Sequence, residues 1–181
     1  MTITNGLPAV PFVSQHDFRI SGMSDLGCGV AALMMLLRYE RAPRRLLSVR
    51  RLCRELKLHI RGSDKGIPDS PGCGVYLEDV IRFFDTHRIA GEARRLKPRR
   101  GFVRLKNILR ASPVMVEMGG DARRWGSYGH WIVLRGASNG EFHYLDPAYK
   151  KRSGRFAKSI TENQFLREWT GDLVFLERGA A

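Results

Sequence analysis

The sequence predicts an α+β fold, in which a helical N-terminal half packs on an antiparallel β-sheet formed by the C-terminal half. Its 181 residues are 43% apolar, enough for the core of one domain, and we expect a single domain over residues 1–181. Apolar residues recur at helical spacing as far as about residue 111, and the pattern becomes strand-like from Pro113 onward. The turn signal 138–140, Ser-Asn-Gly, predicts a hairpin and therefore an antiparallel sheet.

The first half of the chain begins with residues 7–14, which contain two prolines and are expected to form an extended lead-in or an edge strand. A polar loop is expected at 15–27, and a loop rich in glycine and proline at 59–74. The helices predicted in this half span residues 28–40, 48–58, 75–87 and 104–111. Ser48 is a suitable N-cap for the second helix, and the basic segment 94–101 reads as a linker.

The second half has the period-two pattern of β-strands. The predicted strands span residues 113–118, 130–136, 141–146 and 172–177. One further helix is expected at 161–169, before the last strand. No internal repeat or domain boundary is visible.

The chain is strongly basic. It carries 31 basic and 18 acidic residues, a formal net charge of +13, and 24 of the basic residues are arginine. The charge is concentrated at 38–54, with seven arginines and one acid, and at 94–110, with eight basic residues and no acid. Such a surface attracts a polyanion or an acidic protein partner, whereas a merely solvated basic face is the alternative interpretation. No nucleic-acid-binding motif accompanies it.

Three cysteines and the absence of any CxxC pair argue against a disulfide framework and a zinc site, and they fit a reducing compartment. We expect no bound cofactor. No apolar run approaches the ~20 residues of a membrane-spanning helix, and the N-terminus has no readable secretory signal. We therefore expect a cytoplasmic protein, or one exported without a readable N-terminal signal.

Cys28 is the strongest candidate for a nucleophile. It precedes an apolar helix, and the dipole and unpaired N–H groups of a helix N-terminus favour the reactive thiolate. The flanking Gly27 and Gly29 are expected to leave room for a substrate carbonyl. A small buried apolar side chain is the alternative interpretation. Cys73 is also flanked by glycines and precedes a helix, but the helix after Cys28 is the more apolar of the two.

His130 and Asp146 are expected to lie side by side. His130 opens one strand of the predicted hairpin and Asp146 closes the other, and antiparallel pairing brings these ends together. An imidazole oriented by a carboxylate is the general base of a catalytic triad. Each residue alone has an ordinary interpretation, as an exposed strand end or as the start of an Asp-Pro turn.

Gln15 is the only glutamine before Cys28, and its amide is a candidate second donor of an oxyanion hole beside the Cys28 N–H group. A polar residue that ends an extended segment is the alternative interpretation.

Together these segments resemble the C39-type papain-like cysteine peptidases, and in particular the stand-alone C39-like domains. The segments that carry the resemblance are 10–15, 28–33, 113–116, 129–136 and 144–148. The likeness covers a core of about 8–177. It implies a papain-like fold with a central Cys-bearing helix, with Cys28 as nucleophile, His130 as base, Asp146 as the orienting residue and Gln15 in the oxyanion hole.

Three functions follow from these observations. The first is a cysteine peptidase that attacks a peptide or amide carbonyl through a thioester. The second uses the same triad for deamidation or acyl transfer, as in a papain-like effector or toxin. The third is a basic module that binds nucleic acid or an acidic partner.

Overall fold

The computed structural model describes residues 3–4, 7–18, 27–56, 74–119 and 129–177. A six-stranded sheet with the order β3-β8-β4-β5-β6-β7 forms its centre, and every neighbouring pair is antiparallel. The strands are β3 (Gly91–Arg95), β4 (Val114–Met118), β5 (His130–Ser138), β6 (Glu141–Leu145), β7 (Ala157–Thr161) and β8 (Trp169–Leu176). The predicted α+β fold is confirmed.

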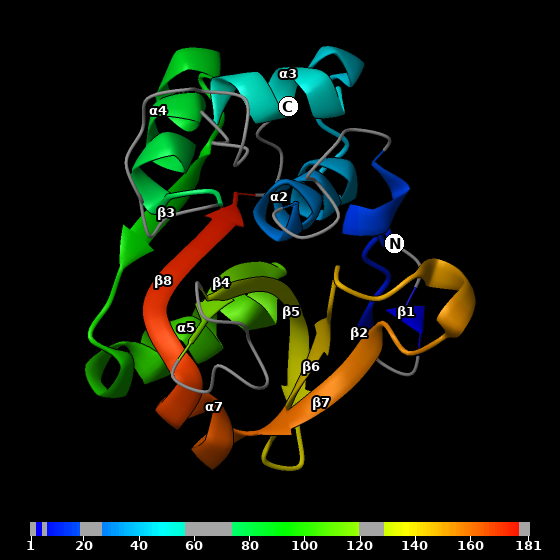
Figure 1. Cartoon of the computed structure of the whole chain (residues 1–181). Coiled ribbons are helices and arrows are strands. Elements are labelled where there is room, and N and C mark those ends of the chain that lie inside the picture. The colour runs from blue at the N-terminus through cyan, green and yellow to red at the C-terminus, as the bar shows by residue number, and fades with distance from the viewer. Residues whose placement is uncertain (1–2, 5–6, 19–26, 57–73, 120–128, 178–181) are drawn as a thin grey trace, which may run out of the picture.

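Helices cover both faces of this sheet (Figure 1). One face carries α2 (Cys28–Tyr39), α3 (Val49–Glu55) and α4 (Leu77–His87), and the other carries α5 (Pro98–Ala111) and α7 (Glu162–Glu168). Ten consecutive residues of α2, 28–37, are buried, so this helix is the centre of the larger core. A helix that is apolar all round is expected to be buried in this way.

The predicted linker at 94–101 is wrong. Residues 91–95 form β3, which pairs with β8, and α5 begins at Pro98 with proline in its first turn. Arg95 faces Asp172 across the pair and forms a two-point ion pair of 2.5 and 2.8 Å with it. This strand depends on contacts with residues about 80 positions away in the chain.

Other differences concern the ends of elements. The strand β7 was not predicted, because three of its five residues are exposed and it forms an edge of the sheet. The helix α4 begins at Leu77 rather than at 75, and the lead-in 7–14 contributes only a short strand, β2 (Leu7–Pro8), paired with β1 (Ile3–Thr4). Most of the loop expected at 59–74, and residues 19–26 of the other loop, lie outside the described residues.

Within the described residues, no helix is long and apolar enough to cross a membrane.

Candidate active site

Cys28 is the first residue of α2 and is only 8% exposed. Gly27 caps the helix without a side-chain hydrogen bond, so the first N–H groups of α2 are not occupied by a capping side chain. The remainder of the buried helix holds the sulfur in a fixed position against the sheet. The thiol therefore sits at the positive end of a helix that is anchored in the core.

His130 and Asp146 meet at one end of the β5–β6 hairpin. His130 begins β5, and Asp146 directly follows β6, whose last residue, Leu145, pairs with Val133. His130 Nε2 lies 2.7 Å from Asp146 Oδ1. Because a carboxylate can only accept, Nε2 carries the proton and donates it, which leaves Nδ1 as the nitrogen that can face the thiol.

The Cys28 thiol and the His130 ring are hydrogen-bonded to each other. Burial raises the pKa of the Cys28 thiol, but the hydrogen bond and charge of His130 lower it, as do the N–H groups of Trp131 and Gly29, and the pKa lies below its ordinary value. For His130, burial acts to lower the pKa, but hydrogen bonds to Asp146 and Cys28 raise it to about 10. Both shifts favour a thiolate–imidazolium pair.

Asp146 is held in its ionised form by its surroundings. Asp146 is 5% exposed, and this burial raises the pKa of its carboxyl group. The His130 hydrogen bond, the Ala148 N–H group and Lys158 lower the pKa by more, so that it lies below its ordinary value. The Ala148 N–H donates to Oδ1 at 3.0 Å, and Lys158 Nζ lies 3.7 Å from Oδ2. The same ammonium group lies 3.7 Å from the centre of the Tyr149 ring.

Gln15 lies next to the turn that follows Asp146. It begins the short 3-10 helix η1 (Gln15–Asp17), which contacts α2, and it is 5% exposed. Its backbone N–H donates to the Pro147 carbonyl at 3.0 Å, and the His16 ring donates to the Ala148 carbonyl at 2.8 Å. The structure therefore brings Gln15 to the part of the fold that holds Cys28 and Asp146. His16, which the sequence placed in a loop, anchors the same turn.

Sequence reasoning missed the role of Trp131. Its indole N–H donates to the Val75 carbonyl at 3.0 Å, which ties the segment before α4 to the start of β5. A Cβ atom on Gly29 would lie 2.6 Å from Val75 Cβ and 3.1 Å from Trp131 Cδ1. Gly29 is thus required for close packing beside the nucleophile, rather than for open space in front of it. A buried tryptophan needs a hydrogen-bond acceptor for its indole N–H group, and this requirement could have predicted from the sequence that Trp131 bonds to another segment.

The remaining cysteines and histidines of the chain are located elsewhere or are not described. Cys53 is half-buried on α3, and burial raises the pKa of its thiol, which favours the unreactive form. His87 bonds to Glu55 and His143 bonds to Ser138. Cys73 and His59 lie outside the described residues.

Known structures share this fold. A protein of Bacillus anthracis, described as a C39-like peptidase, aligns with a TM-score of 0.68 and 17% identity over 94% of this chain and 96% of its own. A double glycine motif protease from an AMS/PCAT transporter, in complex with a leader peptide, aligns with a TM-score of 0.59 and 17% identity over 97% and 96%. The peptidase domain of Streptococcus ComA aligns with a TM-score of 0.55 and 18% identity over 83% and 90%.

No curated protein matches this chain at a significant level. The model of the Peptidase_C39 like family, however, matches residues 8–172, which include all four candidate site residues. With this match and the shared fold, the chain belongs to the C39-like family of cysteine peptidases.

Proposed function

We propose that the chain hydrolyses a peptide bond with Cys28 as nucleophile, His130 as acid and base, and Asp146 as the residue that orients His130. The observation that carries this proposal is the continuous chain of contacts from the buried thiol through the imidazole to the carboxylate at 2.7 Å. A nucleophile, a base and an orienting group in this order are the geometry of a triad.

The reaction begins with attack of the Cys28 thiolate on the peptide carbonyl carbon, which forms a C–S bond and a tetrahedral oxyanion. The His130 imidazolium then gives its Nδ1 proton to the nitrogen as the C–N bond breaks, and the amine leaves. A thioester remains. His130 next takes a proton from water, the hydroxide adds to the thioester carbon, and the C–S bond breaks to release the acid and regenerate the thiolate.

The oxyanion is stabilised by the Cys28 N–H group and the Gln15 side-chain amide. We expect Gln15→Ala to lower kcat by about 10²- to 10³-fold with little change in KM, because one donor to the transition state is lost. Steady-state kinetics on a peptide substrate measure this. Gln164→Ala on α7, which removes the hydrogen bond to Glu168 on the other face of the sheet, is the matched control and should have less than about a twofold effect. An equal loss in both variants would contradict the role of Gln15.

A peptide is the substrate class that we infer. The AMS/PCAT protease with the same fold was solved with a leader peptide bound, which supports a peptide as the substrate here. The same triad could also attack the side-chain amide of a glutamine, which leads to deamidation or acyl transfer. The reaction is therefore assigned by identifying its products.

Mass spectrometry of the products separates these reactions. A mixture of peptides incubated with the enzyme should acquire new N- and C-termini, each cleavage adding one water across a broken backbone bond. A mass gain of about 1 Da on intact peptides would instead indicate deamidation and contradict the peptidase proposal, since the thioester would then come from a side-chain amide.

A further inference from the structure

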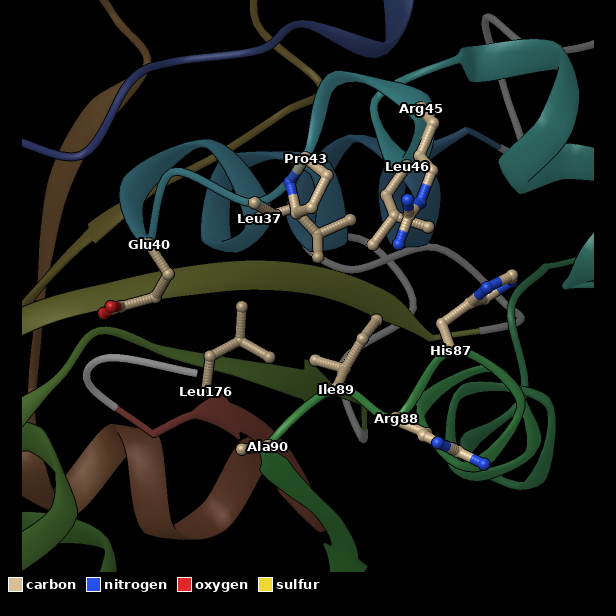
Figure 2. A pocket seen from close by; sticks show the side chains of 11 residues that line it. Leu37, Glu40, Pro43, Arg45, Leu46, His87, Arg88, Ile89, Ala90 and Leu176 are labelled. Atoms are coloured by element: carbon tan, nitrogen blue, oxygen red, sulfur yellow. The ribbon is translucent and has the colours of Figure 1, made fainter. Parts of the chain in front are cut away.

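A second site lies at the other end of α2 from Cys28. A pocket of about 190 Å³ opens beside the C-terminal end of this helix. Leu37, Leu46 and Leu176 line its inner side but are at most 4% exposed, so the apolar surface open to a ligand comes from the half-buried Ala42 and Ile89 and the exposed Pro43 and Ala90 (Figure 2). The volume is below the ~300–1,000 Å³ typical of pockets for whole small molecules, which favours a single inserted side chain.

The surroundings of this pocket are positively charged. Arg45 and Arg88 line the end of the pocket that also holds His87, and Glu40 lies at the opposite end (Figure 2). Both arginines are exposed, and neither forms an ion pair with any acid in the described part of the chain. Three further exposed arginines adjoin pocket residues in sequence and likewise make no ion pair with a described residue: Arg38, Arg41 and Arg44.

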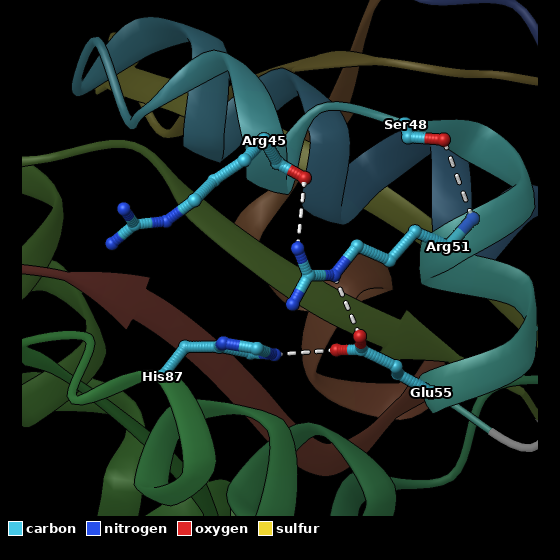
Figure 3. A network of polar contacts seen from close by, with 5 residues as sticks. All are labelled: Arg45, Ser48, Arg51, Glu55 and His87. Carbon is cyan, nitrogen blue, oxygen red and sulfur yellow. Dashed lines mark hydrogen bonds and ion pairs between the residues drawn. The ribbon is translucent and has the colours of Figure 1, made fainter.

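A polar network holds the arginine end of the pocket in place (Figure 3). Glu55 accepts from Arg51 Nε at 2.6 Å and from His87 Nε2 at 2.5 Å, which links α3 to α4. Arg51 also donates to the Arg45 carbonyl at 3.4 Å. Glu55 is therefore already neutralised by its own partners and does not compete for the guanidinium of Arg45. The wall of the pocket is formed before any ligand binds, which lowers the cost of binding.

We propose that this pocket binds an acidic segment of a partner protein, which packs one aliphatic side chain against Ala42, Pro43 and Ile89 and places its carboxylates against Arg45 and Arg88. Guanidinium groups pair well with carboxylates, and an apolar anchor in a small pocket is typical of protein interfaces. The pocket lining contains no Phe, Tyr or Trp on which bases could stack, so a protein segment fits better than a nucleic acid.

The partner segment is distinct from the bound substrate. Leu37 and Glu40, which line the pocket, follow Cys28 by 9 and 12 residues, so the pocket lies about 14 to 18 Å from the start of α2 at 1.5 Å per residue. Enzyme whose Cys28 has been alkylated should therefore bind the segment as well as the free enzyme does. A failure to bind the segment would then leave the proposed peptide hydrolysis standing, and a failure to hydrolyse peptides would leave the proposed binding standing.

The test is fluorescence anisotropy with the alkylated full-length protein and a labelled peptide, Ser-Gly-Leu-Asp-Glu-Asp. We expect saturable binding in the millimolar range or tighter, and about a tenfold loss when serine replaces the leucine of the peptide. The double variant Arg45→Ala/Arg88→Ala should weaken binding to a similar extent. Ala90→Tyr, at an exposed position that lines the pocket, should block it without a change in charge.

The matched control is Arg99→Ala/Arg100→Ala, which removes the same charge from exposed positions of α5 on the other face of the sheet. This variant should bind the peptide within about twofold of the unmodified sequence. The proposal is overturned if no saturable binding occurs, if the leucine and serine peptides bind equally, or if Ala90→Tyr has no effect. Tighter binding of a single-stranded DNA oligonucleotide, unaffected by Ala90→Tyr, would also overturn it and assign the surface to nucleic acid.

Discussion

Replacing Cys28 with alanine is expected to lower kcat/KM for peptide cleavage by at least about 10⁴-fold, because no other group at the site can form the thioester. The fold should survive, since the change removes one sulfur atom from a site at the start of α2 that is anchored by nine further buried residues. Initial rates measure the activity, and thermal unfolding measures the stability. An active Cys28→Ala enzyme would show that Cys28 is not the nucleophile.

Two matched variants sharpen this result. Cys53→Ala removes a half-buried thiol from α3 and should leave kcat/KM within about twofold of the unmodified enzyme. Cys73→Ala tests the second cysteine that the sequence places between glycines before a helix. If activity were lost in Cys73→Ala and retained in Cys28→Ala, the nucleophile would be Cys73 and the assignment to α2 would fail.

Replacing His130 with alanine is expected to lower kcat/KM by about 10³-fold or more. Two effects combine. The leaving amine loses its proton donor, and the Cys28 thiol loses the hydrogen bond and the positive charge that lower its pKa against the effect of burial. The thiol pKa should therefore rise to its ordinary value or above. Initial rates from pH 5 to 10 should show the greatest loss near neutral pH.

The control for His130→Ala is His143→Ala, which removes an imidazole from the same hairpin. His143 bonds to Ser138 at the turn end of β5 and β6, away from Cys28. This variant should retain activity within about twofold. Partial rescue of His130→Ala by added imidazole would support a role in proton transfer. Equal activity losses in both variants would indicate that His130 acts only through the stability of the hairpin.

The parts of the fold that local chemistry determines were predictable from the sequence. The turn at Asn139 and Gly140 has positive φ angles of 52° and 75°, as the hairpin signal requires, and it pairs β5 with β6. The uninterrupted apolar run of α2 likewise predicted a buried helix. By contrast, β3 depends on its pairing with β8 and on the Arg95–Asp172 contact. The five residues of β3 alone carry no sequence pattern that predicts either interaction.

The same distinction holds for the site. Cys28, His130 and Asp146 could be selected because each residue type suits its role and each stands at the end of an element. Other features of the site depend on contacts between segments more than 40 residues apart. Gly29 packs against Val75 and Trp131. Gln15 and His16 anchor the turn that follows Asp146. Periodicity and residue type do not encode such contacts.

The pH dependence of Cys28 alkylation by iodoacetamide tests the thiolate–imidazolium pair most directly, with the modified residue identified by peptide mapping. We expect a half-maximal rate below the ordinary thiol pKa of about 8.5, and a shift to about 8.5 or above in His130→Ala. Cys53, whose thiol pKa is raised by burial, should react only at higher pH in both proteins. A half-maximal rate for Cys28 at or above about pH 8.5 that does not change in His130→Ala would show that the thiolate–imidazolium pair does not form.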